Sequence, residues 1–191
     1  MRKNRNKYER IQFVRDLGFN TEENILIKPT DLSNNYRKFL NDLEKCSLRS
    51  FREEFEDFNS PAHPILTKKE AYSIIPKIRK QGYNIILAKP IDPKDCLFAG
   101  AVYKTSKNIV TEIADGPGTV RRVTRDGKID RSYSAYETDD KKLNKCLAEF
   151  KNCHLENVIF EFSYYKIPVG YKKQNFIVWE ITDDGSNNSR V

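Results

Sequence analysis

The feature that most constrains this chain is its C-terminal region, where two apolar segments each contain one glutamate. Residues Val158–Phe162 and Asn175–Ile181 have the composition of β-strands, and the polar connector between them contains Gly170. Glu161 and Glu180 are the two carboxylates. A charge buried within a strand needs a cation or hydrogen-bond donors, so two carboxylates on adjoining strands can bind a divalent metal, most simply Mg²⁺ bridging to phosphate oxygens. The alternative is that both side chains face solvent on the polar side of a hairpin.

The composition is that of a folded, basic protein. A length of 191 residues allows one domain with a substantial core, for which 11 Phe and 10 Tyr supply large side chains. The formal net charge of +7 favours an anionic partner, which can be a nucleotide, a nucleic acid or an acidic protein. Net charge alone does not choose among these three.

The cysteines and the apolar segments indicate in which cell compartment the protein is expected. Cys46, Cys96, Cys146 and Cys153 form no C-x-x-C pair, which argues against a zinc site. The chain shows neither a signal peptide nor an apolar run of membrane-spanning length. We therefore expect a cytoplasmic protein with reduced thiols and no membrane partner.

The order of the expected elements predicts an α+β architecture within one domain, 1–191. The first part, about 1–83, has helical spacing interrupted by short strands, which indicates a small helical N-terminal lobe. The second part, about 84–182, has mostly strand patterns and predicts a mostly antiparallel sheet backed by helices, with the C-terminal hairpin central to the sheet. Residues 183–191 are polar and are expected to form a flexible tail.

Local signals place several boundaries within these lobes. Thr67 is the expected N-cap of a helix, with Glu70 at the position that completes a capping box. The Asp126-Gly127 pair predicts a hairpin between strands over 120–124 and 128–133. His63 stands between two prolines without a visible partner, and we expect it in a loop rather than as a general base.

Five short motifs follow one another along the chain. Near the N-terminus, Lys7 stands eleven residues before Gly18, and Leu48-Arg49-Ser50 ends an apolar segment. Later come Ala99-Gly100-Ala101-Val102-Tyr103-Lys104 and Glu112-Ile-Ala-Asp-Gly116-Pro-Gly118. The hairpin with Glu161 and Glu180 is the fifth.

In this order the motifs resemble the ATP-binding, ATP-grasp type domain of the phosphoenolpyruvate synthase and pyruvate phosphate dikinase family, of which the chain looks like a stand-alone, divergent relative. The resemblance implies an ATP-grasp-like fold, binding of ATP with Mg²⁺, and phosphoryl transfer or ligation on an unknown acceptor. The chain departs from the family motifs at Phe51, Thr119 and Glu180.

The resemblance also suggests roles for individual residues. Cations suit a triphosphate because charge neutralisation and bidentate guanidinium contacts are the chemistry that phosphoryl transfer needs. Arg49 is the expected catalytic cation, and Glu161 and Glu180 are the expected metal ligands. The expected nucleotide contacts are Lys7, Arg49, Arg52, Lys104, Glu112, Gly116 and Gly118.

Two other functions remain open at this stage. Arg121, Arg122 and Arg125 form the densest basic cluster, and with nearby tyrosines they would suit a module that binds single-stranded nucleic acid by stacking and phosphate contacts. A catalytically inactive ATP-grasp relative that acts through protein contacts is the third interpretation, because a fold does not guarantee its chemistry.

Overall fold

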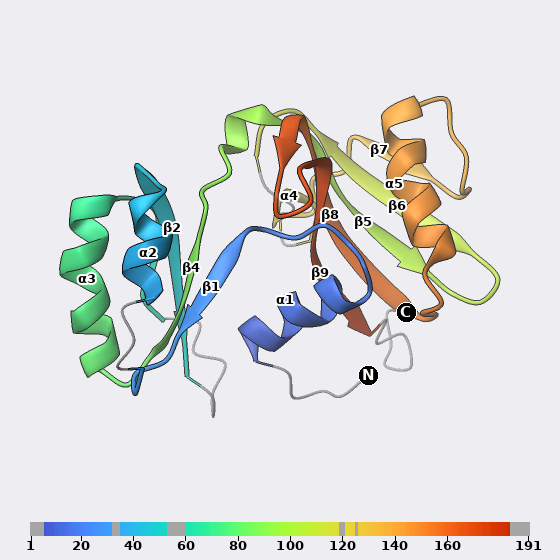
Figure 1. Cartoon of the computed structure of the whole chain (residues 1–191). Coiled ribbons are helices and arrows are strands. Elements are labelled where there is room, and N and C mark those ends of the chain that lie inside the picture. The colour runs from blue at the N-terminus through green and yellow to red at the C-terminus, as the bar shows by residue number, and fades with distance from the viewer. Residues whose placement is uncertain (1–5, 32–34, 53–59, 119–120, 125, 184–191) are drawn as a thin grey trace. The chain divides into compact units, whose positions relative to one another are not determined.

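The chain folds into two compact units. One unit, called here the C-terminal unit, comprises Arg10–Thr21 and the chain from Asp92 onward. The other, the N-terminal unit, comprises Glu22–Ile91 with the start of the first helix. Figure 1 shows their elements in the computed structural model. The structure describes residues 6–31, 35–52, 60–118, 121–124 and 126–183. Asp183, the first residue of the tail expected over 183–191, ends β9 (Gln174–Asp183), whereas Arg125 and residues 184–191 lie outside the described residues.

The N-terminal unit is built on a four-stranded antiparallel sheet in the order β1-β4-β2-β3. Two helices, α2 and α3, lie on one face of it and contribute Leu40 and Ile75 to a core that also contains Leu48 and Leu87. The sheet makes this lobe less helical than its sequence suggests. Its elements are β1 Asn24–Ile27, α2 Asn35–Asn41, β2 Lys45–Phe51, β3 Ala62–Thr67, α3 Lys68–Lys80 and β4 Asn84–Ala88.

Local signals account for both ends of α3. The Thr67 side chain accepts a hydrogen bond from the Glu70 amide, and the Glu70 carboxylate accepts one from the Thr67 amide at 2.8 Å, which confirms the capping box. Gly82, with φ of +82°, follows the helix and lets the chain turn. His63 lies in β3 opposite Leu48, so the expectation of a loop at this position is wrong.

The C-terminal unit contains a five-stranded antiparallel sheet in the order β7-β6-β5-β8-β9. The sequence predicts a hairpin over 120–133, but a short helix, α4, and the edge strand β7 occupy this segment. The other elements of the unit are η1 Pro93–Asp95, β5 Cys96–Lys104, β6 Ile109–Asp115, α4 Arg121–Thr124, β7 Arg131–Tyr133, α5 Lys141–Asn152, β8 Val158–Val169 and β9 Gln174–Asp183. Helix α1 spans Lys7–Asp16. None of the described helices is both long and apolar enough to cross a membrane.

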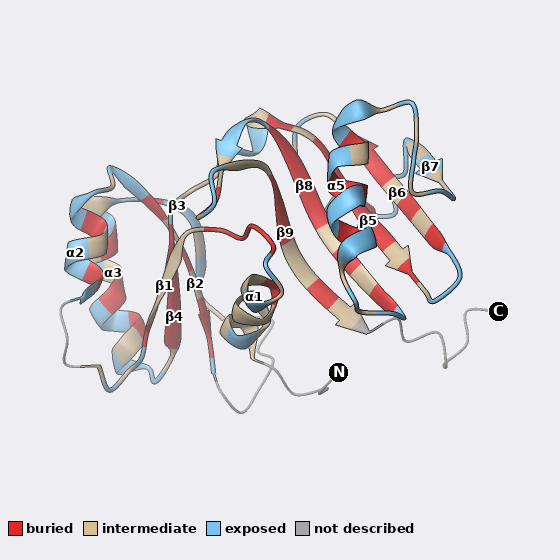
Figure 2. Ribbon diagram, turned by 45° about the vertical axis from the view of Figure 1, so that its right-hand side comes forward, coloured by how far each residue is buried: buried red, intermediate tan, exposed pale blue. Residues whose placement is uncertain are grey.

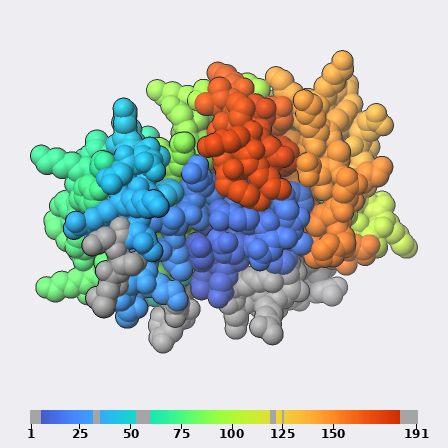
Figure 3. Space-filling model, viewed as in Figure 1, coloured from blue at the N-terminus to red at the C-terminus, as the bar shows by residue number. Residues whose placement is uncertain are grey.

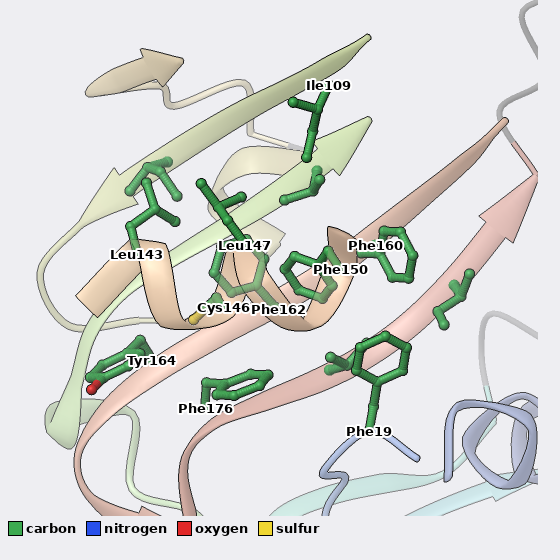
Figure 4. Close-up of a cluster of buried hydrophobic side chains, with 14 of the residues drawn as sticks. Phe19, Ile109, Leu143, Cys146, Leu147, Phe150, Phe160, Phe162, Tyr164 and Phe176 are labelled. Atoms are coloured by element: carbon green, nitrogen blue, oxygen red, sulfur yellow. The ribbon is translucent and has the colours of Figure 1, made fainter. Parts of the chain in front are cut away.

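An aromatic core fills the face of this sheet that packs against α5. The Phe150 ring from α5 stacks on Phe160 of β8 with centroids 4.7 Å apart, and it meets Phe162 edge-on at 5.3 Å. Figure 4 shows these rings together with Leu143 and Leu147 of the same helix. In the space-filling view, atoms of α5 and of the β8–β9 hairpin form adjoining parts of the surface (Figure 3).

A buried asparagine anchors the β8–β9 hairpin. The Asn20 side chain is fully buried and donates to the carbonyls of Phe176 at 2.7 Å and Val169 at 2.9 Å. Its oxygen accepts from the Lys172 amide at 2.9 Å. The turn between the strands is therefore fixed by a side chain that precedes Val169 by 149 residues.

Candidate functional site

Three glutamates stand in one row across the five-stranded sheet. Glu112 of β6 lies opposite Ala101 of β5, Ala101 lies opposite Glu161 of β8, and Glu161 lies opposite Glu180 of β9. Directly opposite residues of antiparallel strands project from the same face, with Cβ atoms about 5 Å apart. The structure therefore places Glu161 and Glu180 together, on one side of the sheet.

This row lies on the face opposite the aromatic core. Glu161 is flanked in β8 by Phe160 and Phe162, which point into the core, so its own side chain points away from it. The strands of the sheet alternate between buried and less buried residues (Figure 2). Both carboxylates are partly exposed, and the Glu180 side chain retains 28% of its accessible surface. They can therefore be reached from solvent.

The only tryptophan of the chain lies beside this row. The register of β9 shifts between Glu180 and Val178, which makes Trp179 the extra residue of a β-bulge. The Trp179 indole donates to the Ser163 hydroxyl at 2.9 Å, and Ser163 is two residues after Glu161 on the same face of β8. The indole is partly exposed. Its fluorescence is therefore a natural reporter on the carboxylate row.

An arginine from α1 neutralises part of this charge. Arg10 Nη1 lies 2.7 Å from Glu180 Oε1. The Arg10 side chain is 29% exposed and the Glu180 side chain 28%. Like charges directly opposite one another in a sheet are destabilising, and a neighbouring guanidinium offsets that repulsion. Glu112, at the other end of the row, accepts a hydrogen bond from the Tyr103 hydroxyl at 3.1 Å.

The carboxylate pair has the donor chemistry that Mg²⁺ prefers. This ion binds through one or two protein carboxylates and completes its octahedron with water and phosphate oxygens. Within the described part of the chain, no group of three or more His, Cys, Asp or Glu side chains is arranged to hold a metal. Glu161 and Glu180 thus fit a site that is shared with a phosphate ligand better than a site made of protein groups alone.

Lys104, expected at the phosphates, is instead at the end of a helix. Its side chain is 7% exposed, and its ammonium group donates to the Phe150 carbonyl at 3.1 Å and to the Cys153 carbonyl. These carbonyls belong to the C-terminal turn of α5, where a cation is favoured by the helix dipole. The lysine therefore links β5 to α5.

The glycines expected to form a phosphate loop also have internal partners. The Gly116 amide donates to the Leu97 carbonyl at 2.7 Å, and the Gly118 amide donates to the Pro93 carbonyl at 3.1 Å. The Arg122 guanidinium donates to the carbonyls of Asp115 and Gly116, both at 2.7 Å. These bonds brace the loop and use the amides that would bind a phosphate.

The other three expected cations, Lys7, Arg49 and Arg52, belong to the N-terminal unit, which includes the first residues of α1. Arg49 of β2 forms an ion pair with Glu22, whose side chain is only 7% exposed. The Arg52 guanidinium lies over the Tyr83 ring, 4.5 Å from its centroid. Lys7 is the first residue of α1.

Sequence reasoning missed the partners of these residues. Arg10 and Glu22 were not among the expected site residues, although they hold Glu180 and Arg49. Arg10 pairs with a residue 170 positions away, and no periodicity or motif in the sequence indicates such a contact. Arg131 bridges Asp115 at 2.6 Å and Asp140 at 2.7 Å, and no motif in the sequence indicates these ion pairs.

Comparison with solved structures finds ATP-grasp ligases. D-alanine-D-alanine ligase from Coxiella burnetii superimposes with a TM-score of 0.54 and 13% identity, over 93% of this chain and 47% of that one. A RiPP-associated ATP-grasp ligase from Chryseobacterium gregarium, in complex with ADP and a leader and core peptide, gives 0.52 and 10%, over 96% and 53%. The ATP-grasp ligase PsnB, complexed with a minimal precursor, Mg and ADP, gives 0.50 and 13%, over 93% and 50%.

These similarities establish the fold. The chain has an ATP-grasp-like α+β fold, as its sequence predicts, and it spans about half the length of the ligases that it resembles. No family model matches the sequence, and no curated protein matches it. The narrower resemblance to the phosphoenolpyruvate synthase and pyruvate phosphate dikinase family stays a prediction.

Proposed function

We propose that this chain is a Mg²⁺-dependent ATP-binding domain that contributes to an ATP-dependent ligation. The observation behind the proposal is the pair Glu161 and Glu180, which are opposite each other in β8 and β9 and are both partly exposed. The ATP-grasp-like fold supports it, because the similar structures are ligases and two of them were determined with ADP. We favour ligation over phosphoryl transfer to a simple acceptor for the same reason.

Each proposed residue has a defined task. Glu161 and Glu180 would supply carboxylate oxygens to Mg²⁺, and the bound ion would neutralise charge on the nucleotide phosphates. Arg49, the expected catalytic cation, and Lys7 and Arg52 belong to the other unit, and their role as phosphate ligands stays a prediction of the resemblance.

Four of the expected nucleotide contacts are not part of the proposal. They are Lys104, Glu112, Gly116 and Gly118. The ammonium group and the two amides among them donate to backbone carbonyls, and the carboxylate is bonded to Tyr103 at the far end of the row from Glu180.

The proposal can be tested through the fluorescence of Trp179. Titration of the wild-type protein with ATP should produce a saturable change that requires Mg²⁺, because the indole lies next to the carboxylate row. Glu180→Gln keeps the side-chain shape but removes the charge. It should weaken the Mg²⁺-dependent response about ten- to hundredfold, the loss expected for a charged contact of roughly 1.5–3 kcal/mol. Glu149→Gln, which changes an exposed glutamate of α5, is the matched control and should leave the titration unchanged.

Two results would contradict the proposal in different ways. An identical Mg²⁺ response in Glu180→Gln and wild type would place the metal elsewhere. The absence of any response at millimolar nucleotide, together with tight and salt-sensitive binding of a single-stranded oligonucleotide, would support the nucleic-acid-binding interpretation instead.

A further inference from the structure

The Arg10–Glu180 ion pair occupies a position that a metal at the carboxylate pair would need. Arg10 Nη1 is 2.7 Å from Glu180 Oε1, a normal distance for a charge-assisted hydrogen bond. Magnesium binds carboxylate oxygens at about 2.0–2.1 Å and carries two positive charges. A guanidinium and a divalent ion this close to one carboxylate repel each other, so each weakens the binding of the other.

Arg10 also reduces the repulsion between the two carboxylates in the metal-free protein. Glu161 and Glu180 are directly opposite across β8 and β9, so their negative charges repel when nothing lies between them. Arg10 is partly exposed, with 29% of its side-chain surface accessible, and α1 brings it to this face. The Arg10–Glu180 ion pair is therefore exposed enough to dissociate. It is also short enough for Arg10 to neutralise Glu180 while no metal is present.

We propose that Arg10, which pairs with Glu180, competes with the divalent metal for this carboxylate. This inference rests on the proposed metal site at Glu161 and Glu180. When a metal binds, the arginine leaves Glu180, and the contact between the α1 side chain and β9 is lost. When the metal leaves, the arginine returns and neutralises the carboxylate.

Thermodynamic linkage makes the consequence measurable. If Arg10 and the metal exclude each other at Glu180, the arginine lowers metal affinity by the same factor by which the metal weakens the ion pair. A partly exposed ion pair and the repulsion between a single and a double charge together correspond to a factor on the order of three to thirty. Arg10 would thus set the metal concentration at which the site fills.

The test compares metal binding by wild type, Arg10→Met and Arg10→Lys at one fixed millimolar concentration of ADP, which supplies the phosphate oxygens that share the site. Mg²⁺ and, separately, Mn²⁺ are titrated as chloride salts, with Trp179 fluorescence and the thermal unfolding midpoint as readouts. Arg10→Met should bind either ion about three- to thirtyfold more tightly, and should gain more thermal stability from the metal than wild type does. Arg10→Lys retains the charge and should bind metal nearly as wild type.

Arg15→Met serves as the matched control. It removes the same charge from the same helix, but Arg15 contacts Thr21 at 3.1 Å and the Tyr171 ring at 4.8 Å. A general change in the charge of α1 would affect both methionine variants alike, and this would overturn the competition. A gain in metal affinity confined to Arg10→Met supports it.

The outcomes also separate the inference from the proposed function. If metal binding depends on Glu180 but Arg10→Met leaves the affinity unchanged or weaker, the competition is refuted and the metal site stands. If neither ion changes fluorescence or thermal stability in wild type or in Arg10→Met, the metal site itself is refuted, and the role of Arg10 with it.

Discussion

Asn20 provides the sharpest test of how the carboxylate hairpin is held. Asn20→Ala removes three side-chain hydrogen bonds and leaves the carbonyls of Phe176 and Val169 and the amide of Lys172 without these partners. The Phe176 contact is fully buried and the other two are partly buried. An unsatisfied buried polar group costs about 1–3 kcal/mol, so we expect a loss of roughly 2–4 kcal/mol of unfolding free energy.

Urea unfolding at pH 7, followed by Trp179 fluorescence, measures this loss within the same unit. The midpoint should fall while the dependence on urea stays unchanged, because the substitution changes stability and not the surface exposed on unfolding. Asn152→Ala, at an exposed position in α5, is the control and should stay within about 0.5 kcal/mol of wild type. A loss below about 1 kcal/mol for Asn20→Ala would show that water replaces the three bonds and that Asn20 does not anchor the hairpin.

Two further predictions concern the C-terminal unit. Burial alone would raise the pKa of Asp140, but hydrogen bonds from Arg131 and from the first amides of α5 hold this pKa below its ordinary value. Arg131→Met should therefore lower the free energy of unfolding by its full amount above about pH 4, where Asp140 is ionised in both states. The loss should shrink as the pH falls through the lowered pKa of Asp140. Equal losses in urea unfolding at pH 7 and pH 3 would contradict this. Gly170 has φ of +73°, and a Cβ there would lie 2.4 Å from the Thr21 carbonyl oxygen, whereas a Cβ at Gly82 would meet nothing within 4 Å. Gly170→Ala should therefore cost more than about 2 kcal/mol and Gly82→Ala about 1 kcal/mol in thermal unfolding, and similar losses would argue against the close approach.

The sequence predicts those parts of the fold that depend on neighbouring residues. The capping box of Thr67 and Glu70 needs only residues three apart, and the alternation of apolar residues around Glu161 indicates a strand. The segment around Asp126 behaves differently, because α4 replaces the expected strand there. Arg122 of this helix donates to three carbonyls at the end of β6 and just after it, six to eight residues earlier, and such bonds override a local hairpin signal.

The position of the terminal hairpin within the sheet could not be obtained locally either. The sequence suggests a central hairpin, but β9 is an edge strand of the described sheet. Of the two hairpin strands, only β8 has a neighbouring strand on both sides. Strand order depends on pairings such as β5 with β8, which join residues about sixty positions apart. The expectation of a central hairpin is therefore wrong, although the pairing of β8 with β9 is confirmed.

In the candidate site, too, contacts within the hairpin are predictable from the sequence, and contacts with distant elements are not. The hairpin pattern brings Glu161 and Glu180 to one row because adjoining strands share a face, and this arrangement is predictable from sequence. The bonds that engage Lys104, Gly116 and Gly118 come from elements that are distant in sequence or from loop geometry. A lysine after an apolar strand resembles a phosphate ligand until the helix end that it binds is known.

Calorimetric titration of ATP into the wild-type protein, with and without Mg²⁺, tests the central claim most directly. The carboxylate pair predicts saturable binding at one site, with an affinity that falls at least tenfold when Mg²⁺ is replaced by a chelator. Binding that is equally strong without Mg²⁺, or no binding at millimolar ATP, would contradict a Mg²⁺-dependent nucleotide site at Glu161 and Glu180.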